Sequence, residues 1–354
     1  MFGPNKEGSQ AQRAGNDSTL IQATGDINIG VSEKRAHEIA RETSKQVISE
    51  FTADAMAMVQ DRILKLDDRI IAALIRENRL QVFADPGFQR TYRKAQEGAA
   101  VSDRDSDYDL LSALMVDRAE RGTKHTIRAG IDRAIEVIDR IDDEALRGLT
   151  VFQAVLQYKP AGGDIDKGLD VMNRLLGQLI DGPLPAGSDW LDHLDILDVV
   201  RPNSSSEFRK FNDFWPTEMM PGYISRGVEE SDAPKTWSYL GKDFRWLSAP
   251  HKFKEGFVRI EAPTKKDFER YYSSLPPEAV EIVSNDADEI FHLSDIDESC
   301  REPLMVLIRA IPKLRMIEEW WDTLPFFSVT AVGRVLARAN AERLDVNKIL
   351  PPLD

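Results

Sequence analysis

The sequence predicts a mainly α-helical protein: a helical bundle or array with a short N-terminal β segment, a long N-terminal helix and an irregular, aromatic-rich insert. Apolar residues recur every three or four positions through residues 33–200 and again after residue 300, which is the period of an amphipathic helix. Alternation of apolar and polar residues is confined to residues 19–30. Tryptophan, tyrosine and proline are dense in residues 201–262, where neither period holds.

The composition predicts a folded protein with a sizeable core. Of the 354 residues, 42% are hydrophobic and 30% are charged, which excludes wholesale disorder. The formal net charge of −14 disfavours generic binding to nucleic acid, although it leaves room for a local basic patch. No apolar run approaches the ~20 residues of a membrane-spanning helix, and the N-terminus lacks the apolar core of a signal peptide. We therefore expect a cytoplasmic protein without a membrane span.

The N-terminus divides into a tail and a β segment. Residues 1–18 are polar and aperiodic, so we predict a disordered tail. Residues 19–31 form a β leader, either a strand or a short hairpin. Because a lone hairpin of this size is marginally stable in water, the leader must pack on the body or pair with the same segment of another subunit. We predict that it assembles a homo-oligomer through Ile21, Gln22, Asp26, Ile27 and Ile29.

Residues 32–84 read as one long helix, or stalk. The segment contains no proline or glycine, and Ser32 is a typical N-cap. An unbroken helix of ~50 residues would be about 75 Å long, which exceeds an ordinary globular helix. Three alternatives stay open: a break near residues 65–68, a coiled-coil stalk, or a long helix that lies on its own domain.

Residues 85–200 predict a helical bundle. The first helix starts at Asp85-Pro86, with aspartate as N-cap and proline as the first helical residue. Glycine and proline in residues 160–163 and 182–185 separate the later helices, and the short joins are typical of a bundle.

The last third of the chain changes character twice. Residues 201–299 predict an irregular insert with short helices and one short strand near residues 257–260. Residues 300–354 return to helical periodicity, interrupted at Pro312 and Pro325, and we expect these C-terminal helices to close the bundle.

Familiar catalytic motifs are missing from the sequence. The five histidines form no H-x-x-x-H or H-E-x-x-H pattern, and no nucleophile elbow, phosphate-binding loop or dinucleotide fingerprint occurs. The single cysteine, Cys300, excludes an intrachain disulfide and a multi-cysteine metal site. We therefore expect neither a metal nor a cofactor.

One acid–histidine pair has the spacing that would place both side chains on the same face of a helix. Asp189 and His193 lie four residues apart, so on a helix they share a face and are weak candidates for a catalytic pair. Such pairs are common on helix surfaces without any function, and that is the simpler interpretation.

The final helix carries candidates for anion binding. Arg334 and Arg338 share one helical face, and with Lys124, Arg128 and Arg133 they form a candidate site for an anion or a nucleic-acid strand. Acidic residues on neighbouring helices would satisfy the same arginines, so a structural role explains them equally well.

Three stretches carry a resemblance. GNDSTLIQATGDINIG (residues 15–30) resembles a short bacterial leader module that precedes helical domains, several of them in phage-defence settings; it differs at Thr24, where glycine is usual. The segments FADPGFQRTYRKAQEGAA, DLLSALMVDRA, IRAGIDRAIEVIDRI and ALRGLTVFQAVLQY look like the helical body of an uncharacterised bacterial family with that leader. SVTAVGRVLARANAERL is similar to that family's last helix and faintly to the end of Abi-alpha abortive-infection proteins.

The resemblance implies a setting and no reaction. It covers roughly residues 15–200 and 300–345, leaves residues 201–299 unplaced, and rests on caps, small residues and core leucines. It implies a non-enzymatic, oligomeric antiviral-defence protein that recognises a protein partner or phage trigger. Two alternatives stay open: a metal-dependent hydrolase or nuclease with acidic ligands, and a sensor of nucleic acid or another anion.

Overall fold

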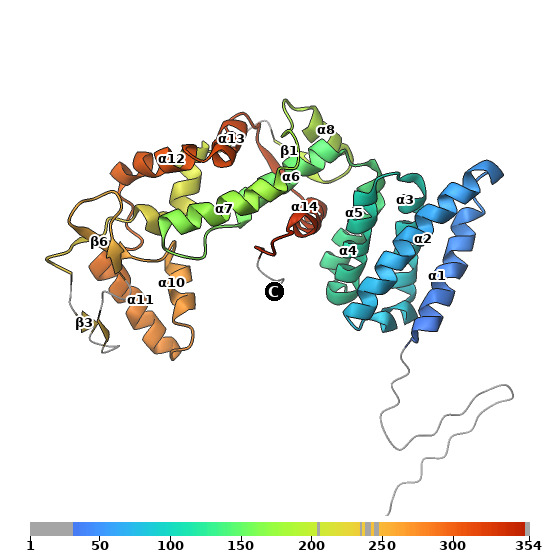
Figure 1. Ribbon diagram of the computed structural model, residues 1–354, viewed down its shortest axis with the longest axis horizontal. Helices are drawn as coiled ribbons and strands as arrows, with labels where there is room; N and C mark the ends of the chain where they lie inside the picture. The colour runs from blue at the N-terminus through green and yellow to red at the C-terminus, as the bar shows by residue number, and fades with distance from the viewer. Residues whose placement is uncertain (1–30, 204–205, 234–235, 238–241, 244–247, 351–354) are drawn as a thin grey trace, which may run out of the picture.

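The computed structural model describes residues 31–203, 206–233, 236–237, 242–243 and 248–350, and it confirms a mainly α-helical protein. Figure 1 shows an elongated arch. Helices α1–α5 form one end, α6, α7 and α14 lie in the middle, and a β-containing unit with α10 and α11 forms the other end. The predicted tail and β leader, including the five leader residues named above, fall outside the described residues.

The first unit is a bundle of five helices: α1 (Glu33–Ile48), α2 (Ala53–Arg76), α3 (Pro86–Val101), α4 (Asp105–Arg121) and α5 (His125–Val137), with a 3-10 turn η1 (Leu80–Ala84) before α3. Two predicted caps are present. Ser32 Oγ accepts from the Arg35 N–H, and the Asp85 carboxylate accepts from the N–H groups of Gly87 and Phe88.

The expected single helix over residues 32–84 is wrong, and so is the suggested break near residues 65–68. The chain turns at residues 49–52, and α1 and α2 form a hairpin, visible at one end of Figure 1. Val47 of α1 packs with Val59 and Ile63 of α2 in a small buried cluster. The hairpin lets the two apolar stripes bury each other, whereas a straight stalk would leave both exposed.

The middle of the arch contains α6 (Asp143–Gln157), α7 (Ile165–Leu179), α8 (Asp189–Ile196), α12 (Arg301–Arg309), α13 (Pro312–Trp321) and α14 (Ala331–Leu344), with a 3-10 turn η2 (Ile138–Arg140) before α6. Strand β1 (Val200–Pro202) pairs antiparallel with β7 (Phe327–Val329). This pairing directs α14 back against α4, α5 and α6. The ring of Phe152 stacks on Trp321 and lies tilted against Phe327 of β7.

The insert is short-stranded and builds a second, small core. It contains α9 (Phe211–Phe214), a π-helical turn (Trp215–Met219), a 3-10 turn (Pro221–Ile224), α10 (Lys265–Tyr271), α11 (Pro277–Phe291) and a 3-10 turn (Glu298–Cys300). Strands β2 (Val228–Glu229), β6 (Phe257–Ile260) and β5 (Ser248–Pro250) form one antiparallel sheet in that order, and β3 (Thr236–Trp237) pairs with β4 (Lys242–Asp243). The strand expected near residues 257–260 is β6. Phe268, Val283 and Phe291 pack in the core beside it.

A tight seam joins this unit to the middle of the arch. A Cβ added at Gly163 would lie 1.9 Å from the carbonyl carbon of Glu261, so the two backbones touch where only glycine fits. Tyr223 donates its hydroxyl hydrogen to the Gly162 carbonyl at 2.7 Å. The seam therefore combines close backbone contact with side-chain hydrogen bonds to backbone carbonyls.

Candidate anion-binding groove

The acid–histidine candidate lies on α8. His193 Nε2 accepts a hydrogen bond from the backbone N–H of Asp142 at 3.2 Å, and Asp142 is the N-cap of α6. Asp189 lies exposed in the first turn of α8. The imidazole thus helps to satisfy the start of α6. Across the described residues, no group of three or more His, Cys, Asp or Glu side chains is arranged to hold a metal ion.

Cys300 lies at the start of α12 and is buried. Burial raises the pKa of its thiol above the ordinary value, with Asp297 adding to the effect. The effect of burial outweighs that of the helix dipole, so Cys300 is a protonated core residue at neutral pH.

The arginine candidates lie in the first half of α14. Thr330 caps this helix by accepting from the Gly333 N–H at 3.2 Å, and a Cβ at position 333 would come within 2.3 Å of the Val199 carbonyl oxygen. The start of α14 is therefore pressed against the turn between α8 and β1. Arg334 and Arg338 follow one helical turn apart and line the same hollow.

Arg121, at the end of α4, completes a three-arginine site that we call the arginine groove. The hollow has a volume of about 350 Å³. Beside the three arginines, its lining is neutral and comprises Thr126, Ile127, Gly130, Gln157, Ala331 and Val335. The nearest acids stand at the rim: Glu342 accepts from Arg338 Nε at 2.8 Å, and Asp117 pairs with Arg121. Arg334 donates from Nη1 to the Val329 carbonyl and forms no ion pair with any residue that the structure describes.

The start of α5 adds to the positive potential of the arginine groove. Thr126 and Ile127 of its first turn line the hollow. This turn contains no acidic residue, and Lys124 at the N-cap position provides no side-chain cap. The unpaired N–H groups and the helix dipole both favour an anion here. Asp117 raises the pKa of Arg121 further, so its positive charge persists at every physiological pH.

The other predicted basic residues do not join the arginine groove. Arg133 forms ion pairs with Glu136 and Asp198. Arg128 lines a separate hollow on the opposite face of α5. Sequence reasoning missed Arg121, although its spacing from Arg118 in the last turn of α4 was a signal that this helix ends in positive charge.

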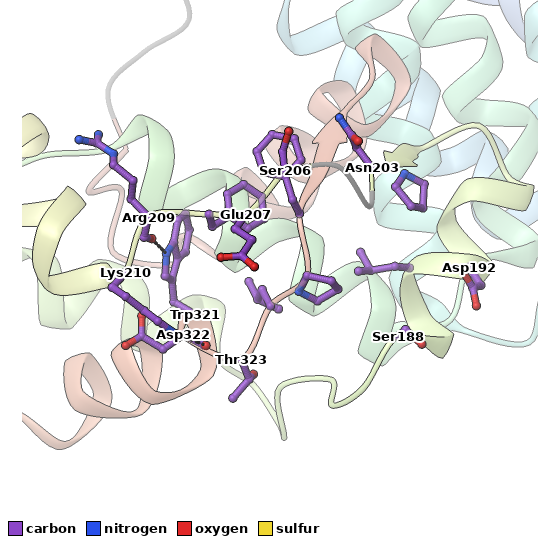
Figure 2. A pocket seen from close by; sticks show the side chains of 16 residues that line it. Ser188, Asp192, Asn203, Ser206, Glu207, Arg209, Lys210, Trp321, Asp322 and Thr323 are labelled. Carbon is purple, nitrogen blue, oxygen red and sulfur yellow. Dashed lines mark hydrogen bonds between the residues drawn. The ribbon is translucent and has the colours of Figure 1, made fainter.

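A larger hollow of about 540 Å³ lies where β1 and β7 meet α8 and α13, and Figure 2 shows it from close by. Its polar groups are largely paired with the protein itself. Trp321 Nε1 donates to the Arg209 carbonyl at 3.0 Å, and Lys210 Nζ donates to the Asp322 carbonyl at 2.9 Å. Both acidic and basic side chains line this hollow, so its charge favours neither anionic nor cationic ligands.

The fold and site together define a mainly α-helical binding scaffold whose clearest charged feature is the arginine groove. The sequence model of one protein family matches residues 30–349, and the chain therefore belongs to that family. The description of the family reads only "-like" and names no activity. No curated protein and no solved structure shows a significant match. Within the described residues, no helix is both long enough and apolar enough to cross a lipid bilayer.

Proposed function

We propose that this chain is a non-enzymatic antiviral-defence protein, of the abortive-infection kind, that recognises an anionic group of a trigger or partner at the arginine groove. It acts in the cytoplasm as a homo-oligomer. The observation that supports recognition is the convergence of Arg121, Arg334 and Arg338 on a hollow without an acidic lining. The defence setting and the oligomer rest on the resemblance of the leader and of the last helix.

The charge of the whole chain makes such a groove selective. With a net charge of −14, most of the surface repels anions at long range. Guanidinium groups bind carboxylate and phosphate oxygens in pairs of parallel hydrogen bonds. An anionic ligand is therefore attracted to places where arginines converge and repelled by most of the remaining surface, which suits recognition better than catalysis.

Reversing the charge of the arginine groove is expected to abolish phage protection. In the variant Arg334→Glu/Arg338→Glu, two cations become anions on partly or fully exposed positions, so the fold should persist. The lost pair between Arg338 and Glu342 is a surface pair, worth under about 1 kcal/mol. Efficiency of plating should rise to that of cells without the protein.

The matched control is Arg140→Glu/Arg174→Glu, which makes the same charge change at exposed positions outside the groove. This control should protect like the unaltered protein. Full protection by the Arg334/Arg338 variant, at equal protein level, would contradict the proposal.

Removal of the leader is expected to dissociate the oligomer. Light scattering should give the full chain a mass that is a multiple of 40.0 kDa, and a chain starting at Ser32 the mass of one subunit. The bundle closes its own core among α1–α5 and α14, so the shortened chain should stay folded. If light scattering gave the same number of subunits for the full chain and for the shortened chain, the leader would not be the element that assembles them.

A further inference from the structure

We propose that a second pocket, on the other face of α5, binds a terminal phosphate group. We call it the Arg118 pocket; it has a volume of about 370 Å³ and is lined by Gly87, Arg90, Thr91, Lys94, Arg118, Arg128, Asp132 and Glu136. Arg128, Asp132 and Glu136 lie on the face of α5 opposite Thr126, Ile127 and Gly130, which line the arginine groove. The two sites share no residue.

Arg118 is the centre of this pocket because it is a buried cation with unused donors. Only 4% of the residue is exposed. Its Nε donates to Asp132 Oδ1 at 2.9 Å, which fixes the plane of the guanidinium. In the described part of the chain, neither Nη group has a hydrogen-bond partner. Both Nη groups are open to the pocket, since neither is among the buried side-chain atoms without a partner, and they can donate to an acceptor that enters it.

Two glycines leave the guanidinium of Arg118 uncovered. A Cβ added at Gly122 would overlap Nη1 at 2.2 Å, and a Cβ at Gly87 would lie 3.5 Å from Nη2. Gly122 ends α4 and Gly87 lies in the first turn of α3, so the cation sits between two helix ends. Any larger side chain at position 122 would displace the guanidinium of Arg118. A larger side chain at position 87 would narrow the access of a ligand to that guanidinium.

The acids that border the pocket are already engaged, whereas two further guanidinium groups are not. Asp132 accepts from Arg118 and from Thr91 Oγ1, and Glu136 pairs with Lys94 and Arg133. Arg90 has no hydrogen bond or ion pair with any described residue, and Arg128 contacts only the ring of His125. The pocket therefore keeps a net positive charge after its internal pairs are counted.

The geometry favours a phosphate group over a carboxylate. A carboxylate is planar and is satisfied by one guanidinium fork. Here guanidinium groups come from three helices, α3, α4 and α5, and can surround the several oxygens of a tetrahedral anion. No apolar or aromatic side chain lines the pocket, so nothing in it would hold a nucleobase or lipid chain. The rest of the ligand projects into solvent.

Titration calorimetry with sodium tripolyphosphate, in a buffer without phosphate, tests this assignment. In the Arg334→Glu/Arg338→Glu background, which removes the arginine groove as a second anion site, we expect one tripolyphosphate per chain at the Arg118 pocket, and roughly tenfold weaker binding for each guanidinium removed by adding Arg90→Ala/Arg128→Ala. Arg118→Lys keeps a cation beside Asp132 but loses the fork, and it should weaken binding by a similar factor. The control Arg140→Ala/Arg174→Ala, added to the same background, should bind like the background chain. No binding at millimolar tripolyphosphate, or equal binding by the Arg90/Arg128 variant, would overturn the proposal.

Further titrations distinguish the sources of the phosphate. A nucleoside triphosphate that binds like tripolyphosphate indicates a small phosphorylated ligand. Tighter binding of a 5′-phosphorylated oligonucleotide than of its 5′-hydroxyl counterpart indicates a strand end. Equal, tighter binding of both oligonucleotides indicates backbone recognition and overturns a terminal-phosphate pocket. Because the titration tests Arg90, Arg118 and Arg128 and the phage challenge tests Arg334 and Arg338, a failure here is separable from a failure of the arginine groove.

Discussion

Replacing Arg259 with methionine is expected to lower the free energy of unfolding by about 4 kcal/mol, the larger of the two stability effects that we predict. Arg259 lies in β6 with 3% of its surface exposed. It donates to the carbonyls of Gly163 at 2.5 Å, Gly222 at 3.1 Å and Ile260 at 3.1 Å. Methionine would fill the space of the stem but take the guanidinium donor from the Gly163 and Ile260 carbonyls, at about 1–3 kcal/mol each, while the Gly222 carbonyl keeps the Ser225 hydroxyl as a donor.

Part of the stability lost in Arg259→Met is offset, because the variant no longer has to bury a charge. Burial lowers the pKa of Arg259 below its ordinary value, which shows that its charge is costly to keep in this place. Removing the charge recovers some of that cost, so the net loss is smaller than two full acceptor penalties. The lost contact of the guanidinium with the Tyr223 ring, 5.6 Å from its centroid, acts in the opposite direction.

Urea unfolding and amide hydrogen exchange measure the outcome. Because Arg259 crosses the seam between β6 and the segment before α7, protection should fall first in β6 and α10 and later in α1–α5. Arg226→Met, an exposed arginine of the same unit, is the matched control and should change stability by less than about 0.5 kcal/mol. An Arg259→Met chain as stable as this control would show that the seam does not need the guanidinium.

The helices could be predicted from the sequence, but the turn between α1 and α2 could not. Periodicity placed apolar residues on one face throughout residues 33–84, and no glycine or proline marks residues 49–52. The chain turns there because Val47 finds Val59 and Ile63 as partners, a tertiary gain that local propensity does not contain. Thr52, the N-cap residue of α2, was the only local signal.

The sequence predicts the residues of a candidate site that lie on one helix, but not the residues that other helices add to it. The spacing of Arg334 and Arg338 on one helix predicts a shared face. Arg121 joins them only because the pairing of β1 with β7 returns α14 to α4 across more than 200 residues of chain. The burial of Arg118 against Asp132 depends on the packing of α4 against α5, and no pattern within either helix indicates it.

A rise in pH from 3 to 7 is expected to destabilise the protein by about 3 kcal/mol through Asp67 alone. This side chain is 5% exposed between α1, α2 and α3, and burial raises its pKa from 3.8 to about 6. Below pH 3.8 both the folded and unfolded chains hold the proton, and the stabilising contribution is fully present. Between these two pKa values only the folded chain holds it, so stability falls as pH rises and levels off above about 6.

Burial favours the neutral form of Asp67 and outweighs its three hydrogen-bond donors, which lower the pKa. Tyr92 and Gln96 both donate to Oδ1, at 2.5 and 2.8 Å. Ser44 Oγ lies 3.0 Å from Oδ2 and 2.8 Å from the Ala40 carbonyl, but it has one hydrogen for two acceptors. A protonated Asp67 donates to Ser44, which is then free to donate to Ala40. The charged form must instead compete for the single Ser44 hydrogen with the Ala40 carbonyl, which also accepts from Gln96 at 3.4 Å.

Asp67→Asn isolates this contribution, because asparagine can accept from Tyr92 and Gln96 and donate to Ser44 at every pH. The difference in unfolding free energy between the unaltered chain and this variant, measured by urea titration from pH 3.5 to 7.5, should change by about 3 kcal/mol and flatten above pH 6. Asp68→Asn changes the exposed neighbour and should follow the unaltered chain in parallel. Parallel profiles for the unaltered chain and Asp67→Asn would mean that Asp67 titrates alike in both states, and the argument that burial favours its neutral form would fail.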